Sequence, residues 1–469
     1  MPVQDRPAPQ HRSAPQPSLS VFDAVTIMVG LVVGIGIFRT PSLVAANVES
    51  EIAFIGVWVA GGLVTLIGAL CYAELSAANP HAGGEYHFLS RAYGRPMAVL
   101  FGWARTSVIQ TGAIAGVAFV LGDYAQQMLP LGPYGPALYA GMAIVLFTGV
   151  NVIGTFQSKT LQVVVTFVEI GAITAIIAFG LLGSMGTESV IASVIASPSA
   201  SATGSAAIGM AMIFVLLTYG GWNETAYLTG EIKDAPRNIA KVLILGTAIL
   251  TVLYVLINLA LLSILGLDGL RSSQAVAADM MLLVAGPAGA FLVSLAVLVA
   301  AVSTLNATIF TGGRVYFAMA RDLTLLPKVG EWDERGRNPA NGLIAQGVVA
   351  LALVVLGAAT RGGFQAMVDY TAPVFWGFLL LTGLGLIVLR IREPNRSLPY
   401  KVPLYPLTPI LFCLTCVYML HASIAYTGIS ALIGLAVLAA GVPLLFFRRA
   451  DAAVSAPGRT VPARPTGTR

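Results

Sequence analysis

Charged residues are scarce in this chain. Asp, Glu, Lys and Arg make up 10% of its 469 residues, whereas a soluble domain carries about a quarter. Long windows, such as 52–73 and 189–223, contain none of them. A helix needs about 20 mostly apolar residues to cross a bilayer. The scarcity of charge excludes an ordinary soluble domain and predicts an all-α polytopic membrane protein.

Side chains suited to catalysis or metal binding are also few. The three cysteines, Cys71, Cys413 and Cys416, fall inside predicted spans, where a free cysteine usually packs as a small hydrophobic residue. The four histidines show no metal-ligand spacing, and the chain contains no H-E-x-x-H, G-x-S-x-G or Walker sequence. We therefore expect a protein without catalytic residues, bound metal or cofactor, which is not an enzyme.

Hydropathy predicts twelve transmembrane helices. They cover approximately residues 21–46, 51–76, 97–127, 136–155, 160–184, 206–229, 238–266, 284–313, 341–360, 366–390, 404–426 and 429–447. The last two come from residues 402–447, a run without Asp, Glu, Lys or Arg that is long enough for two helices. Residues 426–430 are the predicted turn between them.

Lys and Arg fall mainly on one side of the predicted membrane. Of the 26, 22 lie in one set of alternate segments, Arg271 and Arg361 lie in the opposite loops, and Arg39 and Arg105 lie within spans. Because basic residues favour the cytoplasmic side, both termini are predicted to be cytoplasmic. The net charge of +5 reflects this bias and requires no nucleic-acid partner. The polar ends, residues 1–19 and 448–469, are predicted to be disordered cytoplasmic tails.

Two predicted spans contain helix-breaking residues. In the first, Gly30 and Gly34 could form a small-residue packing face. However, Gly34 and Gly36 flank a single residue, and the following Pro41 disfavours helix. In the sixth, residues 217–224 read L-T-Y-G-G-W-N-E at membrane depth. The two spans are five apart, as in inverted five-helix repeats that each open with a discontinuous helix, so we interpret both as functional breaks.

Broken helices of this kind can bind a zwitterion. Backbone groups freed inside the bilayer must be satisfied by protein, water or a ligand. The N–H groups at the start of a half-helix attract an anion such as a carboxylate. Unwound carbonyls can accept hydrogen bonds from an ammonium group. The two breaks therefore predict a site for a molecule that carries both groups.

An ordered set of motifs runs along the chain. Residues 34–38, G-I-G-I-F, are similar to G-[SA]-G-I-F, and residues 219–223, Y-G-G-W-N, with the T-G-E-I-K-D-A-P-R-N-I of 229–239, resemble a sixth-helix signature. Residues 303–322 resemble the eighth helix and the loop after it, and residues 84–86 resemble the G-G-x-Y sequence before span three. The family with this set is the amino-acid permeases of the amino acid–polyamine–organocation (APC) superfamily, and the resemblance is closest to L-type transporters and their bacterial relatives.

The resemblance implies a fold and a division of the chain. It implies a LeuT-like core of two inverted five-helix repeats, residues 20–184 and 206–392. Residues 404–447 would then form two helices outside this core, within a total of twelve transmembrane helices.

The same resemblance implies a substrate site, carried over residue by residue. The amides around Gly34, Ile35 and Gly36 would bind the substrate carboxylate, and carbonyls near Tyr219 and Gly220 would bind the ammonium. Tyr219 and Trp222 would line or gate the pocket. The predicted substrate site comprises Gly34, Ile35, Gly36, Tyr219, Gly220, Gly221, Trp222 and Glu224.

Three departures from the family pattern refine these expectations. Ile35 stands where many relatives have serine, which removes one hydroxyl contact to the carboxylate, and Leu217 stands where eukaryotic L-type members often have phenylalanine. With Trp222 these residues make the pocket apolar, which favours neutral side chains. The loop at 129–136 lacks the cysteine that links eukaryotic L-type members to a glycoprotein, so we expect no disulfide-linked heavy-chain partner.

Charges inside predicted spans are costly, by about 2.5–3.5 kcal/mol near a helix centre, and usually functional or paired. Glu169 lies where many relatives have a lysine that replaces a coupling cation, so a carboxylate there indicates a protonatable or cation-binding site. A structural ion pair between Arg105 and Glu169 is the alternative. Glu224 could contact the substrate or face a water-filled vestibule. The predicted coupling residues are Glu169, Arg105, Ser303 and Asn306.

These observations predict a secondary transporter that moves small, neutral L-amino acids by alternating access. We expect it in a cell membrane, the bacterial inner membrane, with membrane lipids around it and with proton coupling or exchange. The alternative substrate is a polyamine or another organic cation, which would favour more acidic groups than Glu169 and Glu224 at membrane depth. A membrane amino-acid sensor would be expected to carry a long structured cytoplasmic domain.

Overall fold

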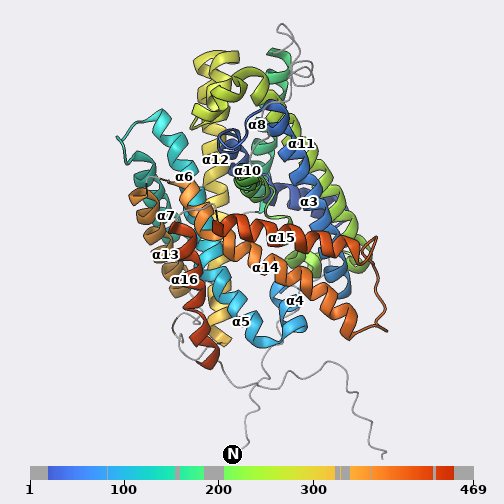
Figure 1. Cartoon of the computed structure of the whole chain (residues 1–469). Coiled ribbons are helices and arrows are strands. Elements are labelled where there is room, and N and C mark those ends of the chain that lie inside the picture. The colour runs from blue at the N-terminus through green and yellow to red at the C-terminus, as the bar shows by residue number, and fades with distance from the viewer. Residues whose placement is uncertain are drawn as a thin grey trace, which may run out of the picture.

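The computed structural model describes residues 19–81, 83–153, 159–183, 205–322, 328, 339–360, 362–425 and 429–447. Within these residues the regular structure is helical, apart from one isolated bridge between Leu19 and Ile232. The elements, labelled as in Figure 1, are α1 (Val21–Val32), η1 (Ile35–Phe38), α2 (Thr40–Ala45), α3 (Glu51–Ala78), α4 (Gly84–Tyr93), α5 (Arg95–Ala104), η2 (Arg105–Ile109), α6 (Gln110–Met128), α7 (Gly135–Ile153), α8 (Lys159–Gly183), α10 (Ser205–Thr218), η4 (Trp222–Glu231), α11 (Ala235–Ser272), α12 (Val276–Asp322), α13 (Ala340–Ala359), α14 (Phe364–Arg392), α15 (Leu407–Ala425), α16 (Ile429–Ala439) and η5 (Val442–Phe447).

The all-helical polytopic architecture predicted from hydropathy is confirmed. Among the described residues, nine helices are long and apolar enough to cross a membrane, and each falls on a predicted span. The three other predicted spans fall on α1 to α2, on α8, and on α10 with η4. The total of twelve spans, the cytoplasmic location of both termini and the repeat boundaries remain predictions. Residues 426–428 of the predicted turn lie outside the described residues.

Local sequence explains where several helices begin and bend. Ser20 caps α1: its hydroxyl accepts a hydrogen bond from the Asp23 amide, while the Asp23 carboxylate accepts one from the Ser20 amide. The long helices α11 and α12 each bend at a glycine with positive φ, Gly266 (64°) and Gly286 (69°). Only glycine adopts this conformation without strain. These two bends lie close to the predicted end of span seven and the predicted start of span eight.

Small residues let α3 lie close against α10 and α11. A Cβ atom on Gly62 would lie 2.4 Å from Thr251 Cγ2 of α11, and one on Gly61 would lie 2.3 Å from Val215 Cγ1 of α10. Helices in membranes commonly approach through such small residues. In Figure 1, α3 and α11 run side by side, as do α14 and α15.

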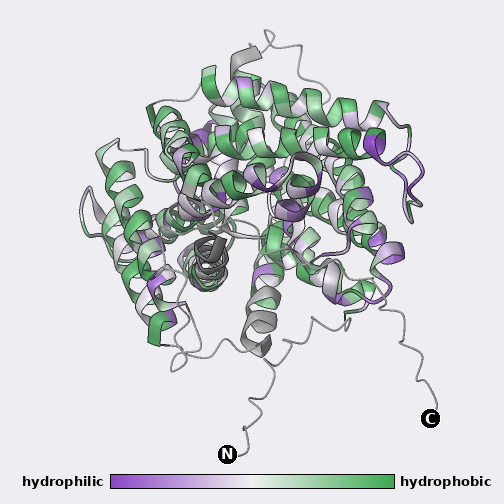
Figure 2. Ribbon diagram, turned by 90° about the horizontal axis from the view of Figure 1, so that it is seen from below, coloured by the Kyte–Doolittle hydropathy of each residue, from purple (hydrophilic) through white to green (hydrophobic). Residues whose placement is uncertain are grey.

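The outward-facing surface is apolar. Large hydrophobic side chains remain exposed along the helices, for example Leu283, Leu292 and Val355. Figure 2 shows most of the helical ribbon as hydrophobic. An extensive exposed apolar surface marks contact with lipid or another apolar partner, as expected for a membrane protein.

Candidate functional site

The first helix is interrupted at the predicted glycines. α1 ends at Val32, Gly34 is extended (φ −106°, ψ −170°), and a short 3-10 turn, η1, precedes α2. A Cβ atom on Gly34 would have only the Val32 carbonyl oxygen within 4 Å, at 3.9 Å. The packing-face interpretation is therefore wrong for Gly34, which lies in the break itself. Among the described residues, no side chain caps η1.

The sixth predicted span is interrupted in the same way. α10 ends at Thr218 and η4 begins at Trp222. Between them, Gly221 has a φ of 103°, and a Cβ atom there would also lie 3.1 Å from the Leu31 carbonyl oxygen. A Cβ atom on Gly220 would lie 2.7 Å from the Leu217 carbonyl oxygen. Both glycines are therefore required by the backbone conformation.

The two breaks lie beside each other and are joined by hydrogen bonds. Thr218 Oγ1 donates to Thr40 Oγ1 at 2.7 Å, and Thr40 Oγ1 donates to the Gly36 carbonyl at 2.9 Å. The Tyr254 hydroxyl of α11 lies 2.8 Å from the Val32 carbonyl oxygen and 3.2 Å from that of Thr218. One tyrosine therefore serves the last carbonyl of α1 and the last carbonyl of α10. Sequence reasoning missed Tyr254, because nothing local connects it to either break.

The two aromatic residues predicted to line or gate the site pack in different surroundings. Tyr219 is fully buried, and its ring centroid lies 4.9 Å from that of Tyr254 and 6.4 Å from that of Trp58. Trp222 packs edge-on against Tyr72 of α3, with centroids 4.8 Å apart, and against Phe412 of α15. Trp222 thus connects the second break to α15, outside the ten predicted core helices.

A polar cluster, here called the Arg105 cluster, joins η4, directly after the second break, to side chains of earlier helices. Arg105 Nη2 lies 2.8 Å and 2.6 Å from the two carboxylate oxygens of Glu224, and Arg105 Nη1 lies 3.6 Å from Glu85 Oε2. Glu85 also accepts hydrogen bonds from the Tyr72 hydroxyl at 2.5 Å and from the Asn223 amide at 3.1 Å. The cluster comprises Arg105, Glu224, Glu85, Tyr227, Asn223 and Tyr72.

The Arg105 cluster corrects one interpretation drawn from the sequence. The alternative of an Arg105–Glu169 ion pair is wrong, because Arg105 binds Glu224 of η4 and Glu85 of α4. Both oxygens of Glu224 accept from Arg105, so in this conformation Glu224 is engaged in an ion pair. In the sequence, Glu85 stands out only as part of the motif at residues 84–86, because its partners Arg105 and Asn223 lie far from it along the chain.

Glu169 lies apart from this cluster. Its side chain is buried on α8, which packs against α11 and α12. Since α11 carries Tyr254, Glu169 lies on a helix that packs against the helix whose tyrosine contacts both breaks. Of the other predicted coupling residues, Asn306 on α12 accepts a hydrogen bond from Asn151 of α7 at 2.7 Å, and Ser303 is half-buried on the same helix.

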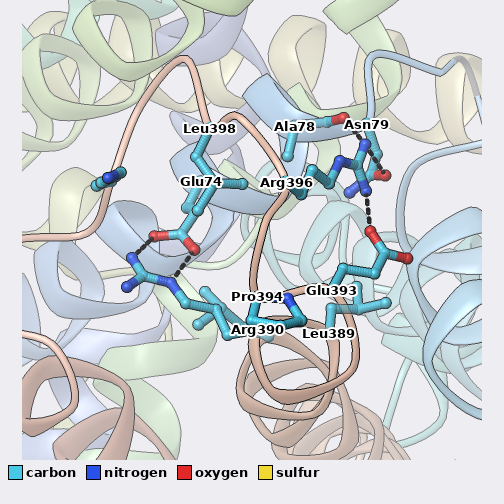
Figure 3. A pocket seen from close by; sticks show the side chains of 11 residues that line it. Glu74, Ala78, Asn79, Leu389, Arg390, Glu393, Pro394, Arg396 and Leu398 are labelled. Atoms are coloured by element: carbon cyan, nitrogen blue, oxygen red, sulfur yellow. Dashed lines mark hydrogen bonds and ion pairs between the residues drawn. The ribbon is translucent and has the colours of Figure 1, made fainter.

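A separate cavity of about 130 Å³ lies where α3 and α14 end (Figure 3). The Arg390 guanidinium donates to both carboxylate oxygens of Glu74, at 2.6 and 2.5 Å, and Arg396 donates to Glu393 at 2.8 Å. Burial of Glu393 opposes its ionisation, but Arg396 and Arg91 outweigh this and hold the pKa of Glu393 below its usual range. The first pair ties the end of α3 to the end of α14, the second lies within the segment after α14, and neither contacts a break.

Comparison with known proteins matches the sequence of this chain to a family. The amino acid permease family model matches residues 19–442. The chain is 30% identical over 413 residues to b(0,+)-type amino acid transporter 1 of Mus musculus, which covers 87% of this chain and 83% of that protein. It is 28% identical over 440 residues to the serine/threonine exchanger SteT of Bacillus subtilis, covering 91% and 96% of the two chains. It is 27% identical over 435 residues to the large neutral amino acids transporter small subunit 2 of Homo sapiens, covering 91% and 79%.

Proposed function

This chain belongs to the amino acid permease family, and we propose that it moves small neutral L-amino acids across the membrane by alternating access. The protein is an amino-acid permease of the APC superfamily and a multi-pass membrane protein. Relatives named for serine and threonine and for large neutral amino acids support a neutral substrate. The family membership does not favour a polyamine substrate.

The observation that carries the proposal is the contact between the two breaks. Gly36 and Thr218 lie so close that a Cβ atom on Gly36 would be 3.7 Å from Thr218 Cγ2. A ligand at this contact can meet the η1 amides and the carbonyls after α10 together. We propose that the amides of residues 34–36 bind the carboxylate and that the carbonyls of Tyr219 and Gly220 bind the ammonium. Backbone groups freed inside a membrane protein need such partners.

Uptake into liposomes that contain only the purified chain tests this proposal. We expect uptake of serine, threonine or leucine without any second polypeptide, since we propose that no disulfide-linked partner is needed. Methyl esters and decarboxylated analogues should compete poorly, because each leaves one half of the backbone site unpaired, at about 1–3 kcal/mol for a buried group. Strong competition by the decarboxylated amines would contradict the assignment. Binding without uptake would indicate a sensor instead.

Glycine substitutions locate the site. Gly36→Val should abolish binding while the protein stays folded, because the added side chain occupies the contact between the breaks. Gly220→Val should also abolish binding, and its Cβ atom forces the backbone away from the Leu217 carbonyl. Gly56→Val is the matched control, since Gly56 of α3 has open space around it. Unchanged affinity in both break variants would refute the site.

We further propose that Glu169 couples transport to protons. Its burial on a helix that packs against α11 supports this role, because a carboxylate there can change protonation as the breaks open to either side. Glu169→Gln should still bind substrate but lose accumulation driven by a pH gradient in liposomes. Asp268→Asn removes an exposed carboxylate and serves as the control. If Glu169→Gln still concentrates substrate with the gradient, proton coupling by this residue is refuted.

A further inference from the structure

A cavity of about 490 Å³ lies next to the first break and belongs to no site described above. It is bounded by the residue after η1, by α6 and the loop that follows it, by the α11–α12 connection and by the start of α14. Its walls include Arg39, Asp123, Gln274, Phe119, Tyr134 and Phe364. The volume is in the range of small-molecule sites, about 300–1,000 Å³. In the predicted topology it opens on the non-cytoplasmic side.

One cation and one anion share this cavity. Arg39 Nε lies 3.4 Å from Asp123 Oδ2, with side chains only 12% and 16% exposed. The other guanidinium nitrogens are engaged: Nη1 donates to Ser42 Oγ at 2.7 Å and Nη2 to Gln274 Oε1 at 2.7 Å. Nε is buried and has no hydrogen-bond partner among the described residues. The ion pair is therefore not reinforced by a hydrogen bond from Nε. Arg39 can offer a ligand the second N–H group of Nη2, beside the one that Gln274 accepts.

The remaining walls are apolar. Phe119 and Phe364 are almost fully buried, while Tyr134, in the loop after α6, is more than half exposed. Buried aromatic walls with a few placed polar groups are typical of small-molecule sites. A zwitterionic amino acid matches this combination, because its carboxylate suits Arg39, its ammonium suits Asp123, and a neutral side chain suits the rings.

We propose that this outer cavity binds a second amino-acid zwitterion, outside the break contact, with its carboxylate on Arg39 and its ammonium on Asp123. The inference rests on the proposed function in that it takes a neutral amino acid as ligand. Arg39 directly follows η1, and the Tyr124 hydroxyl, next to Asp123 in sequence, donates to the Phe38 carbonyl at 3.0 Å. The outer site is thus connected to the outer end of the first break.

The proposal is tested by the rate at which a thiol introduced into the cavity wall is modified, in a variant that does not bind substrate at the breaks. Ala137→Cys places a thiol in the cavity wall, and the native cysteines are buried. In the Gly36→Val background, L-leucine should slow modification by a membrane-impermeant thiol reagent. At about ten times Kd, mass action leaves about a tenth of sites open, so labelling should slow about tenfold. Leucinamide and 3-methylbutylamine should not protect, because each lacks the carboxylate.

Two variants complete the test. Asp123→Asn should remove the protection and Asp123→Glu should retain part of it, both in protein that remains monodisperse. A thiol at Ser272→Cys, exposed and outside the cavity, should label at the same rate with and without leucine. The proposal is overturned if leucine gives no protection in the Gly36→Val background, or if Asp123→Asn keeps it. An error in the proposed site at the breaks would show separately, because Gly36→Val would then bind substrate there with unchanged affinity.

Discussion

Removing the Tyr254 hydroxyl should weaken both the fold and substrate binding. Tyr254→Phe keeps the ring that packs on Tyr219 and Trp58 and deletes only the oxygen near the Val32 and Thr218 carbonyls. A hydroxyl has one proton, so it satisfies one of these carbonyls at a time. The Val32 carbonyl also accepts a hydrogen bond from the Gly34 amide at 2.7 Å, so the Thr218 carbonyl is the acceptor that would lose its partner, at a cost of about 1–3 kcal/mol. If substrate binding requires the two breaks to keep their relative position, the same energy weakens binding by about 5- to 150-fold.

A matched tyrosine separates the two effects. The Tyr370 hydroxyl of α14 donates to the Ser107 carbonyl at 2.8 Å and is also buried, but it contacts neither break. We expect Tyr254→Phe and Tyr370→Phe to lower the unfolding temperature of the purified protein similarly, measured by fluorescence. Only Tyr254→Phe should weaken binding of radiolabelled amino acid. Wild-type affinity in Tyr254→Phe, or an equal loss of affinity in both variants, would show that the Tyr254 hydroxyl does not support substrate binding at the breaks.

Three further outcomes are expected. Gly221→Ala should destabilise the protein by about 1–2 kcal/mol in thermal unfolding, because alanine is strained at positive φ. Glu224→Gln should remain folded, because Arg105 still pairs with Glu85. Arg105→Met should lower the free energy of unfolding by about 3–5 kcal/mol, because Glu85 stays buried without its cation. Equal stability of the two variants would contradict this. Glu393→Gln should be less stable than wild type at pH 7 by at most about 1 kcal/mol. Because the pKa of Glu393 is lowered in the fold, this difference should shrink as pH falls below about 4.3, measured by unfolding at pH 7 and pH 4.

Sequence alone determined the features that depend on local chemistry. The apolar windows located the spans, because the length of a membrane helix follows from bilayer thickness. The breaks at Gly34 and at Gly220–Gly221 were predictable, because glycine pairs and a following proline act on the backbone of their own segment. Gly266 and Gly286 bend their helices for the same reason, close to the predicted span boundaries.

The lateral packing of the helices determines which residues from different helices contact each other. Arg105 could have paired with any buried carboxylate. It pairs with Glu224 and Glu85 because helix packing brings η4 and α4 within reach of its side chain, whereas Glu169 lies on α8. Tyr254 serves two breaks that lie more than 180 residues apart in the chain. Partner choice at such separations depends on how helices pack laterally. Hydropathy and backbone preference are properties of single segments and carry no information about it.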